Sequence, residues 1–200
     1  LNFALNAYSL VCKAVAMSML KFSWCLLPGF VLSSWLASAN AAPDYFSEQG
    51  YRIQHYRSPT PTTNAWAQVI TADQLLALRA SHPELVLVDV YRNPWLHGQF
   101  TATEPHANLP GSLWLANCGD GVLSEAWLSY CQQYLAQATA DNFHHPIVFY
   151  CRSDCWLGWN ASKRAYQWGY RQLYWLRNGI DEWQQQGLPL VTAQPAPFIP

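Results

Sequence analysis

The chain has 200 residues, of which 51% are hydrophobic and only 12% are charged, and its formal net charge is −1. This composition excludes an intrinsically disordered chain, which needs low hydrophobicity and high charge, and it offers no basic surface for nucleic acid. The length predicts one domain with, at most, a short extension. The unusual residues are 11 Trp and six Cys, so their positions along the chain carry most of the functional information.

The first segment of the chain has the form of a secretion signal. Lys21 precedes an apolar run from Phe22 to Leu36, and the sequence Ala39-Asn40-Ala41 is a small-x-small cleavage site. We expect residues 1–41 to be a signal peptide, with residues 1–18 as an over-extended start, and we expect a periplasmic protein. The apolar run is shorter than the ~20 residues of a membrane span, so no stable span is expected after cleavage. An uncleaved anchor is the alternative.

The rest of the chain alternates apolar runs with helical segments. Residues 42–66 are polar and punctuated by prolines, which predicts an extended N-terminal arm, and residues 192–200 form a C-terminal tail. Residues 67–191 form the expected domain, and alternating strands and helices predict an α/β fold with a central parallel sheet flanked by helices. The expected elements, in chain order, are a helix after the capping box at Thr71, a buried strand at 85–90, a long connection at 92–111, a short strand at 112–116, a helix after Ser124, a buried strand at 146–150, a helix ending near Gly169, a strand at 173–176 and a last helix at 180–186.

The strand at 146–150 leads into Cys151, which is followed by a tight loop and a helix. Ligands of open α/β sheets bind at the carboxyl ends of strands, and a helix N-terminus there directs N–H groups and partial positive charge at the loop. That field and the adjacent Arg152 favour a thiolate. Cys151 is therefore the candidate nucleophile, and a buried structural cysteine is the alternative.

Several segments together resemble a rhodanese domain, and they occur in the order typical of that family. They are similar to its strand with Asp-Val-Arg, its Pro-Gly-Ala turn, its active-site strand with the cysteine, and its Gly-Gly-Ile-x-x-Trp signature. The segments are LVLVDVYR (85–92), NLPGSLWL (108–115), PIVFYCRS (146–153), WGYRQLYWL (168–176) and NGIDEW (178–183). The resemblance implies a single rhodanese-like domain.

Two segments resemble a narrower group of periplasmic rhodanese-like proteins. These are GYRIQHYRSPTP (50–61) and CRSDCWLGWNASKRA (151–165). The group is named for a CXXCW motif and is associated with catabolism that depends on pyrroloquinoline quinone (PQQ). This second resemblance implies that the chain serves a PQQ-dependent alcohol or aldehyde oxidation system.

The resemblance implies sulfur-transfer chemistry at Cys151. The cysteine would accept a sulfane sulfur from a small donor, hold it as a persulfide and pass it to an acceptor, which splits one transfer into two steps. Arg152, Ser153, Asp154 and Trp156 would form the substrate-binding loop. The implied partners are a small sulfur donor and acceptor or a thiol partner, together with a PQQ-dependent dehydrogenase system. No cofactor is expected in this chain.

The loop departs from the family pattern at two positions. Asp154 stands where a typical rhodanese has Gly, and Trp156 stands where it has Arg. A carboxylate there disfavours an anionic donor such as thiosulfate, and the missing arginine removes a bidentate anion clamp. The alternative function is therefore a catalytically inactive binding module for a quinone or a partner dehydrogenase.

The other cysteines leave several possibilities open. Cys155, four residues after Cys151, can act as a resolving thiol, close a disulfide with Cys151, or simply pack at the start of the helix. Cys118 and Cys131 can pair, although spacing alone does not show it. A zinc site lacks recognisable ligand spacing, so we expect no metal.

Three further residues are judged by their place in the family pattern. Asp89 matches the family's Asp and is expected to be a structural hydrogen-bonding group, whereas Arg92 stands one residue later than the family's Arg. His106 lies two residues before the position of the family's histidine, which is Asn108 here. We therefore expect His106 to be a solvated loop residue. An aromatic pocket at Trp156 is the expected place for an apolar ligand, with simple core packing as the alternative.

Overall fold

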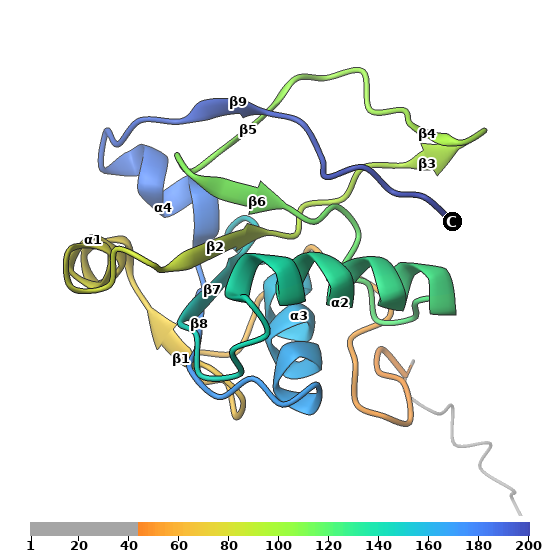
Figure 1. Cartoon of the computed structure of the whole chain (residues 1–200), viewed down its shortest axis with the longest axis horizontal. Helices are drawn as coiled ribbons and strands as arrows, with labels where there is room; N and C mark the ends of the chain where they lie inside the picture. The colour runs from red at the N-terminus through yellow and green to blue at the C-terminus, as the bar shows by residue number, and fades with distance from the viewer. Residues whose placement is uncertain (1–43) are drawn as a thin grey trace, which may run out of the picture. The chain divides into compact units, whose positions relative to one another are not determined.

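A five-stranded parallel sheet forms the centre of the domain, with the strand order β1-β8-β7-β2-β6 (Figure 1). The structure is a computed structural model that describes residues 44–200, so the expected signal peptide at 1–41 lies outside the described residues. The elements are β1 (Gln68–Ile70), α1 (Ala72–Ser81), β2 (Val86–Asp89), β3 (Trp95–Leu96), β4 (Gln99–Phe100), β5 (His106–Asn108), β6 (Ser112–Trp114), α2 (Glu125–Thr139), β7 (Ile147–Tyr150), α3 (Trp156–Gln167), β8 (Leu173–Leu176), α4 (Gly179–Gln185) and β9 (Val191–Ala193).

The four strands expected from apolar runs are all present, as β2, β6, β7 and β8. Strand β7 lies in the middle of the sheet, between β8 and β2, and all four of its residues are buried. A strand covered on both faces has a continuous apolar sequence, and this is why the apolar run at 146–150 predicted β7. Its carboxyl end therefore opens at the centre of one edge of the sheet.

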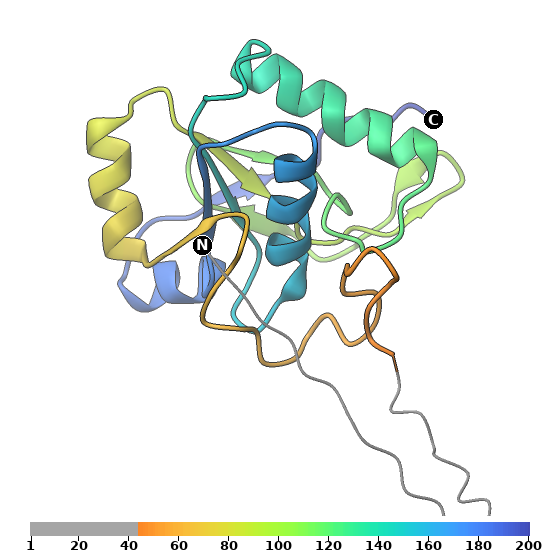
Figure 2. The same ribbon diagram turned by 90° about the horizontal axis from the view of Figure 1, so that it is seen from below.

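Helices cover both faces of the sheet (Figures 1 and 2). Apolar residues of α2 and α3 pack in one core cluster with one face, and those of α1 and α4 pack in a second cluster with the other. The predicted α/β fold with a central parallel sheet flanked by helices is confirmed.

Two helices begin at the residues that the capping pattern predicted. The Thr71 hydroxyl accepts a hydrogen bond from the Gln74 backbone, and the Gln74 side chain accepts one from the Thr71 backbone. Ser124 caps α2 by accepting from the backbone of Trp127. Such caps bond N–H groups that the first helical turn leaves unpaired, so a local signal sets the start of each helix.

Several short strands were not predicted. The connection at 92–111 contains the β3–β4 hairpin and strand β5, and β5 pairs antiparallel with β9 near the end of the chain. The C-terminal tail also packs on the domain, because Ala196 donates to the carbonyl of Trp114. Phe198 stacks on Trp127 with 3.7 Å between ring centroids. The tail thus covers part of the face that carries α2.

A disulfide joins Cys118, in the loop after β6, to Cys131 on α2. Arg164, which is buried on α3, donates from Nη1 to the carbonyl of Cys118 at 2.6 Å. The disulfide and this hydrogen bond tie the loop after β6 to both helices on the same face of the sheet.

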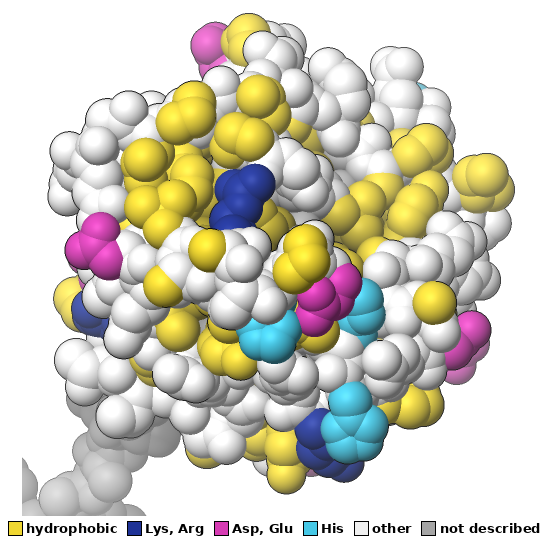
Figure 3. Space-filling view, turned by 60° about the vertical axis from the view of Figure 1, so that its left-hand side comes forward, with side chains coloured by type: hydrophobic (Ala, Val, Ile, Leu, Met, Phe, Trp, Pro, Cys, Tyr) yellow, Lys and Arg dark blue, Asp and Glu magenta, His cyan; other side chains and the backbone are white. Residues whose placement is uncertain are grey.

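The described surface carries few charges. On the face drawn in Figure 3, basic side chains lie singly among apolar and polar ones and form no continuous stripe. Within residues 44–200, no helix combines the length and the hydropathy needed to cross a bilayer.

The double variant Cys118→Ala/Cys131→Ala tests how much the disulfide stabilises the domain. Thirteen positions separate the two cysteines, and a loop of about that length predicts a loss of about 3 kcal/mol in the free energy of unfolding. Guanidinium denaturation without reductant measures the loss. The same comparison with reductant is the control, and there the difference should shrink to the packing of two sulfur atoms. Equal stability of variant and wild type without reductant would contradict the prediction.

Candidate functional site at the Cys151–Cys155 loop

Cys151 directly follows β7, and Cys155 is the N-cap residue of α3. Only three residues separate them, so the loop runs from the carboxyl end of the central strand straight into a helix. The two sulfurs are joined in a disulfide, and the exposed fractions of the residues are 3% and 1%. Of the possibilities open for Cys155, the structure therefore has the disulfide with Cys151.

Helix α4 holds one side of the loop. Arg152 donates from Nε and Nη2 to Oδ1 of Asp181, at 3.2 and 3.0 Å, and the backbone N–H of Ser153 donates to Oδ2 at 2.9 Å. The hydrogen bond to Asp181 raises the pKa of Arg152 above its ordinary value. The positive charge of Arg152 is therefore paired with a carboxylate, whereas the sequence suggested that it would stabilise a thiolate at Cys151.

The backbone at the start of α4 touches the backbone of the loop. The N–H of Ile180 donates to the carbonyl of Cys151 at 3.0 Å, and Ser153 Oγ donates to the carbonyl of Asn178. Gly179 has a φ of +51°, and a Cβ added there would collide with the carbonyl of Cys151. Glycine is thus required at 179 both by its left-handed conformation and by the closeness of the loop.

The N-terminal arm, residues 44–66, holds the other side of the loop. Arg57 and Cys155 form an isolated antiparallel bridge, and Arg57 Nη1 donates to the carbonyl of Ser153 at 2.8 Å. The N–H of Ser58 donates to the carbonyl of Asp154 at 3.0 Å. The arm therefore pairs with the loop through backbone groups, and it covers the loop in the manner of a short added strand.

A carbonyl of the arm also accepts a hydrogen bond from the start of α3. The N–H of Trp156, in the first turn, donates to the carbonyl of Tyr56 at 2.9 Å. The first N–H groups of a helix have no partner within the helix and commonly bind anions. Because Tyr56 occupies this donor, a small anion has one fewer backbone group to bind in the loop.

Trp156 is packed against the arm rather than in an open pocket. The residue is 9% exposed, and its Nε1 donates to Ser58 Oγ at 3.1 Å. The guanidinium of Arg52 lies 5.0 Å from the Trp156 ring centroid, within cation–π range, and the ring of Phe46 meets it edge-on at 5.5 Å. Of the two hypotheses for Trp156, a ligand pocket or core packing, the structure favours core packing.

Asp154 occupies the position where a typical rhodanese has glycine. Its φ is +50°, a left-handed conformation that Asp tolerates better than most residues, and its side chain is exposed. The loop thus retains the glycine-like backbone but presents a carboxylate to solvent.

Asn160 anchors the arm to α3, and sequence reasoning did not single it out. The residue is fully buried, and its Oδ1 accepts from the N–H of Arg52 at 2.9 Å. Its Nδ2 donates to the carbonyls of Arg52 and Gly119, at 2.8 and 2.9 Å. The available signal was an asparagine in the middle of a helix expected to pack on the sheet, because a buried amide needs hydrogen-bond partners.

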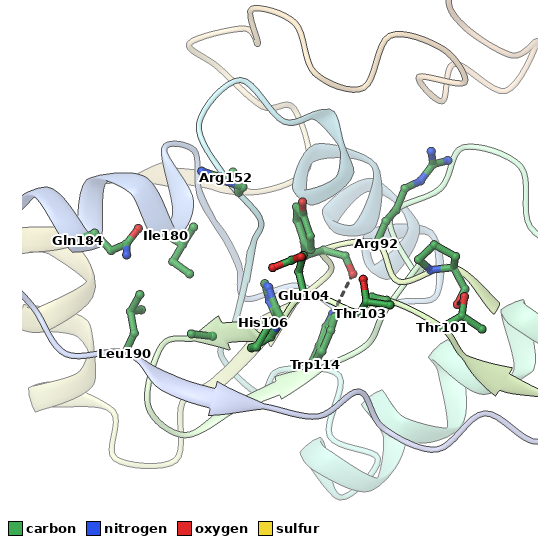
Figure 4. A pocket seen from close by; sticks show the side chains of 15 residues that line it. Arg92, Thr101, Thr103, Glu104, His106, Trp114, Arg152, Ile180, Gln184 and Leu190 are labelled. Atoms are coloured by element: carbon green, nitrogen blue, oxygen red, sulfur yellow. Dashed lines mark hydrogen bonds between the residues drawn. The ribbon is translucent and has the colours of Figure 1, made fainter.

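A cavity of about 680 Å³ lies next to the loop (Figure 4). Arg152 and Ile180 belong to its wall, but neither cysteine does. The other lining residues are Tyr91, Arg92, Pro94, Thr101, Ala102, Thr103, Glu104, Pro105, His106, Ala107, Trp114, Gln184 and Leu190. The aromatic pocket of this domain is therefore formed by Tyr91, His106 and Trp114 and does not include Trp156.

The expectation that His106 is a solvated loop residue is wrong. Its Nε2 lies 2.6 Å from Oδ2 of Asp89, and the side chains are 14% and 1% exposed. The His106 ring also stacks on Tyr91, at 4.9 Å between centroids. The physical reason is that Asp89 ends a buried strand and needs a hydrogen-bond donor, which His106 supplies from the antiparallel strand β5. Burial raises the pKa of Asp89, while the hydrogen bond from His106 opposes that rise.

Asp89 and Arg92 thus have partners that the sequence did not reveal. Besides His106, Asp89 accepts from the N–H of Tyr91 at 2.8 Å, in keeping with the structural role expected for it. Arg92 pairs through Nε with Asp120 at 2.5 Å. Within residues 44–200, no group of three or more His, Cys, Asp or Glu side chains is arranged to hold a metal ion.

The fold and the loop define an α/β domain with a cysteine at the carboxyl end of its central strand. The family model of the rhodanese-like domain matches residues 71–186, which is more than half of the chain. The chain belongs to the rhodanese-like domain family. Among curated proteins, no match was found.

Several solved structures are similar to the chain. Thiosulfate sulfurtransferase from Pseudomonas aeruginosa is 18% identical, with a TM-score of 0.46, over 67% of this chain and 22% of that one. The polysulfide-sulfur transferase homodimer from Wolinella succinogenes is 15% identical, with a TM-score of 0.42, over 66% of this chain and 82% of that one. The match thus spans less than a quarter of the length of the Pseudomonas protein.

Replacing Asn160 by alanine tests whether this residue holds the arm on the loop. The change leaves backbone groups of Arg52 and Gly119 buried without partners, so we expect a loss of about 3 kcal/mol in stability. We also expect faster amide hydrogen exchange in residues 44–58 than elsewhere in the chain. The control is Asn142→Ala at an exposed position. Exchange that rises uniformly over the domain would show that Asn160 stabilises the core and has no particular effect on the arm.

Proposed function

We propose that the protein carries out thiol-based sulfur transfer, with Cys151 as the reacting cysteine and Cys155 as the resolving cysteine. The observation that carries the proposal is the disulfide between them, at the carboxyl end of the central strand. This edge is where α/β sheets bind ligands. Membership of the rhodanese-like domain family supports a cysteine that carries sulfur. Arg152, Ser153, Asp154 and Trp156 form the loop around the reacting sulfur.

The chemistry starts from the reduced pair. The Cys151 thiolate attacks the sulfane sulfur of a donor, forms a persulfide and releases the rest of the donor with its electron pair. A nucleophilic acceptor can then take the outer sulfur and regenerate the thiolate. Alternatively, the Cys155 thiolate attacks the Cys151 sulfur, which releases hydrosulfide and forms the disulfide. An external thiol reductant, itself oxidised, then returns both cysteines to the reduced state.

The contacts of the loop argue against thiosulfate as the sulfur donor. Asp154 adds a negative charge beside the position where an anion would bind, and the N–H of Trp156 is already bonded to Tyr56. Both features disfavour a small dianionic donor. A neutral organic trisulfide or a thiol-bound sulfane sulfur meets less repulsion, so we propose that class of donor.

We also propose that the protein works in the periplasm, in a PQQ-dependent alcohol or aldehyde oxidation system. Two disulfides within residues 44–200 support an oxidising compartment. The association with PQQ rests on the resemblance of residues 50–61 and 151–165 to the CXXCW group. In this chain three residues, rather than two, separate the cysteines.

A second candidate function is a binding module without catalysis, for a quinone or a partner dehydrogenase. The observation that favours it is the cover of arm residues on the loop, because Arg57 and Ser58 bond to loop carbonyls where a substrate would approach. In that case Cys151 and Cys155 stay oxidised and stabilise the loop.

Intact mass spectrometry distinguishes the two functions. The protein is reduced, freed of reductant and mixed with a neutral organic trisulfide as the sulfane-sulfur donor. We expect the wild type to gain one sulfur atom transiently and then to return to the disulfide while hydrosulfide is released. Cys155→Ser should retain the added sulfur for at least about tenfold longer, because no resolving thiol is present.

Cys151→Ser is the matched control and should gain no sulfur. Equal gains in this variant and the wild type would assign the sulfur to another cysteine and overturn the proposal. A wild type that reduces fully but never takes up sulfur would instead favour the binding module.

A further inference from the structure

The cavity beside the loop has a lining of mixed charge that the sulfur-transfer chemistry does not use. Its volume of about 680 Å³ suits a small molecule. Glu104 supplies a carboxylate, whereas Arg92 and Arg152 supply guanidinium groups. In the view of Figure 4, Glu104 and His106 lie between the two arginines. A ligand that carries both a positive and a negative group would match this lining.

The groups suited to a cation are Glu104 and His106. The Glu104 side chain is exposed at the cavity wall and takes part in no ion pair within residues 44–200. The His106 Nε2 is bonded to Asp89, so in the described part of the chain its Nδ1 is the ring nitrogen left for a ligand. Its ring stacks with Tyr91 and lies 4.2 Å from that of Trp114, and aromatic faces attract an ammonium group.

The candidate groups for a carboxylate are the two arginines. Arg152 uses Nε and Nη2 for Asp181, and because a guanidinium group has five N–H donors, others remain for a ligand. Arg92 uses Nε for Asp120, and its guanidinium covers the ring of Tyr56 at 4.2 Å. Guanidinium groups bind carboxylates through charge-assisted hydrogen bonds. Arg152 therefore keeps donors for a second anion, whereas the guanidinium of Arg92 points away from Glu104 and His106 in Figure 4.

We propose that this cavity binds a small α-amino acid as its zwitterion. The ammonium group contacts Glu104 and Nδ1 of His106, and the carboxylate contacts Arg152. A flat or apolar side chain packs against the rings of Tyr91 and Trp114 and against the aliphatic side chains of Ile180 and Leu190, which also line the cavity. The cysteines take no direct part in this binding, because neither Cys151 nor Cys155 lines the cavity.

Three related probes test the proposal on the purified protein with its disulfides intact. L-phenylalanine carries both charges, 3-phenylpropanoate lacks the ammonium group, and phenethylamine lacks the carboxylate. We expect L-phenylalanine to bind at least about tenfold more tightly than either of the others in calorimetric titrations, since each analogue loses a charge-assisted hydrogen bond. Amide NMR shifts should change first at Tyr91, His106 and Trp114.

Two surface variants assign the ends of the ligand. Glu104→Gln should weaken L-phenylalanine and phenethylamine by about tenfold and leave 3-phenylpropanoate unchanged or tighter. Arg152→Gln should weaken L-phenylalanine and 3-phenylpropanoate and leave phenethylamine unchanged. Both side chains are exposed, so neither change opens the core. Glu125→Gln, on an exposed position of α2, is the matched control and should change nothing.

The two variants should therefore have opposite effects on phenethylamine and 3-phenylpropanoate. Equal binding of all three probes, or L-phenylalanine binding that neither variant changes, would overturn it. Absence of L-phenylalanine binding at millimolar concentration would overturn it as well. Sulfur uptake at Cys151 is measured separately, so failure of either proposal leaves the other standing.

Discussion

The loop between β7 and α3 is short, and it is bonded on both sides. Three residues connect Cys151 to Cys155, α4 holds the loop through Asp181 and the N–H of Ile180, and the arm holds it through Arg57. We expect a loop held in this way to keep the two cysteines close when the disulfide is reduced. Cleavage of the disulfide therefore creates two neighbouring thiols without requiring a new backbone conformation, which is the arrangement that a resolving cysteine needs.

Arg152 belongs to both the loop and the wall of the cavity, and it is paired with Asp181 of α4. Asp181 accepts hydrogen bonds from the side chain of Arg152 and from the backbone of Ser153, so the ion pair and the loop backbone depend on one carboxylate. An anion that binds Arg152 in the cavity would share this guanidinium group with Asp181. The loop and the cavity wall therefore share one charged group, the guanidinium of Arg152.

The sequence predicted the elements whose signals are local. Thr71 and Ser124 mark helix starts by their own side chains, and β7 is apolar because both of its faces are covered. Strands β5 and β9 could not be predicted, since each is short and forms only by pairing with the other. The position of Cys151 was predictable as well, because it directly follows the apolar run of β7. The arm over the loop was not, because it depends on hydrogen bonds between distant segments.

The error at His106 has a similar cause: family position argued for a solvated residue, whereas the buried carboxylate of Asp89 set its environment. Gly179 is a second residue that affects the site from a distant position in the sequence. Its backbone lies against the carbonyl of Cys151, so any larger residue there forces the backbone of the loop or of the start of α4 to shift, while both cysteines remain in the sequence. A relative can therefore keep the whole cysteine motif and still lose the site through a change at one distant glycine. Transfer of function between such sequences must consider that glycine as well as the cysteines.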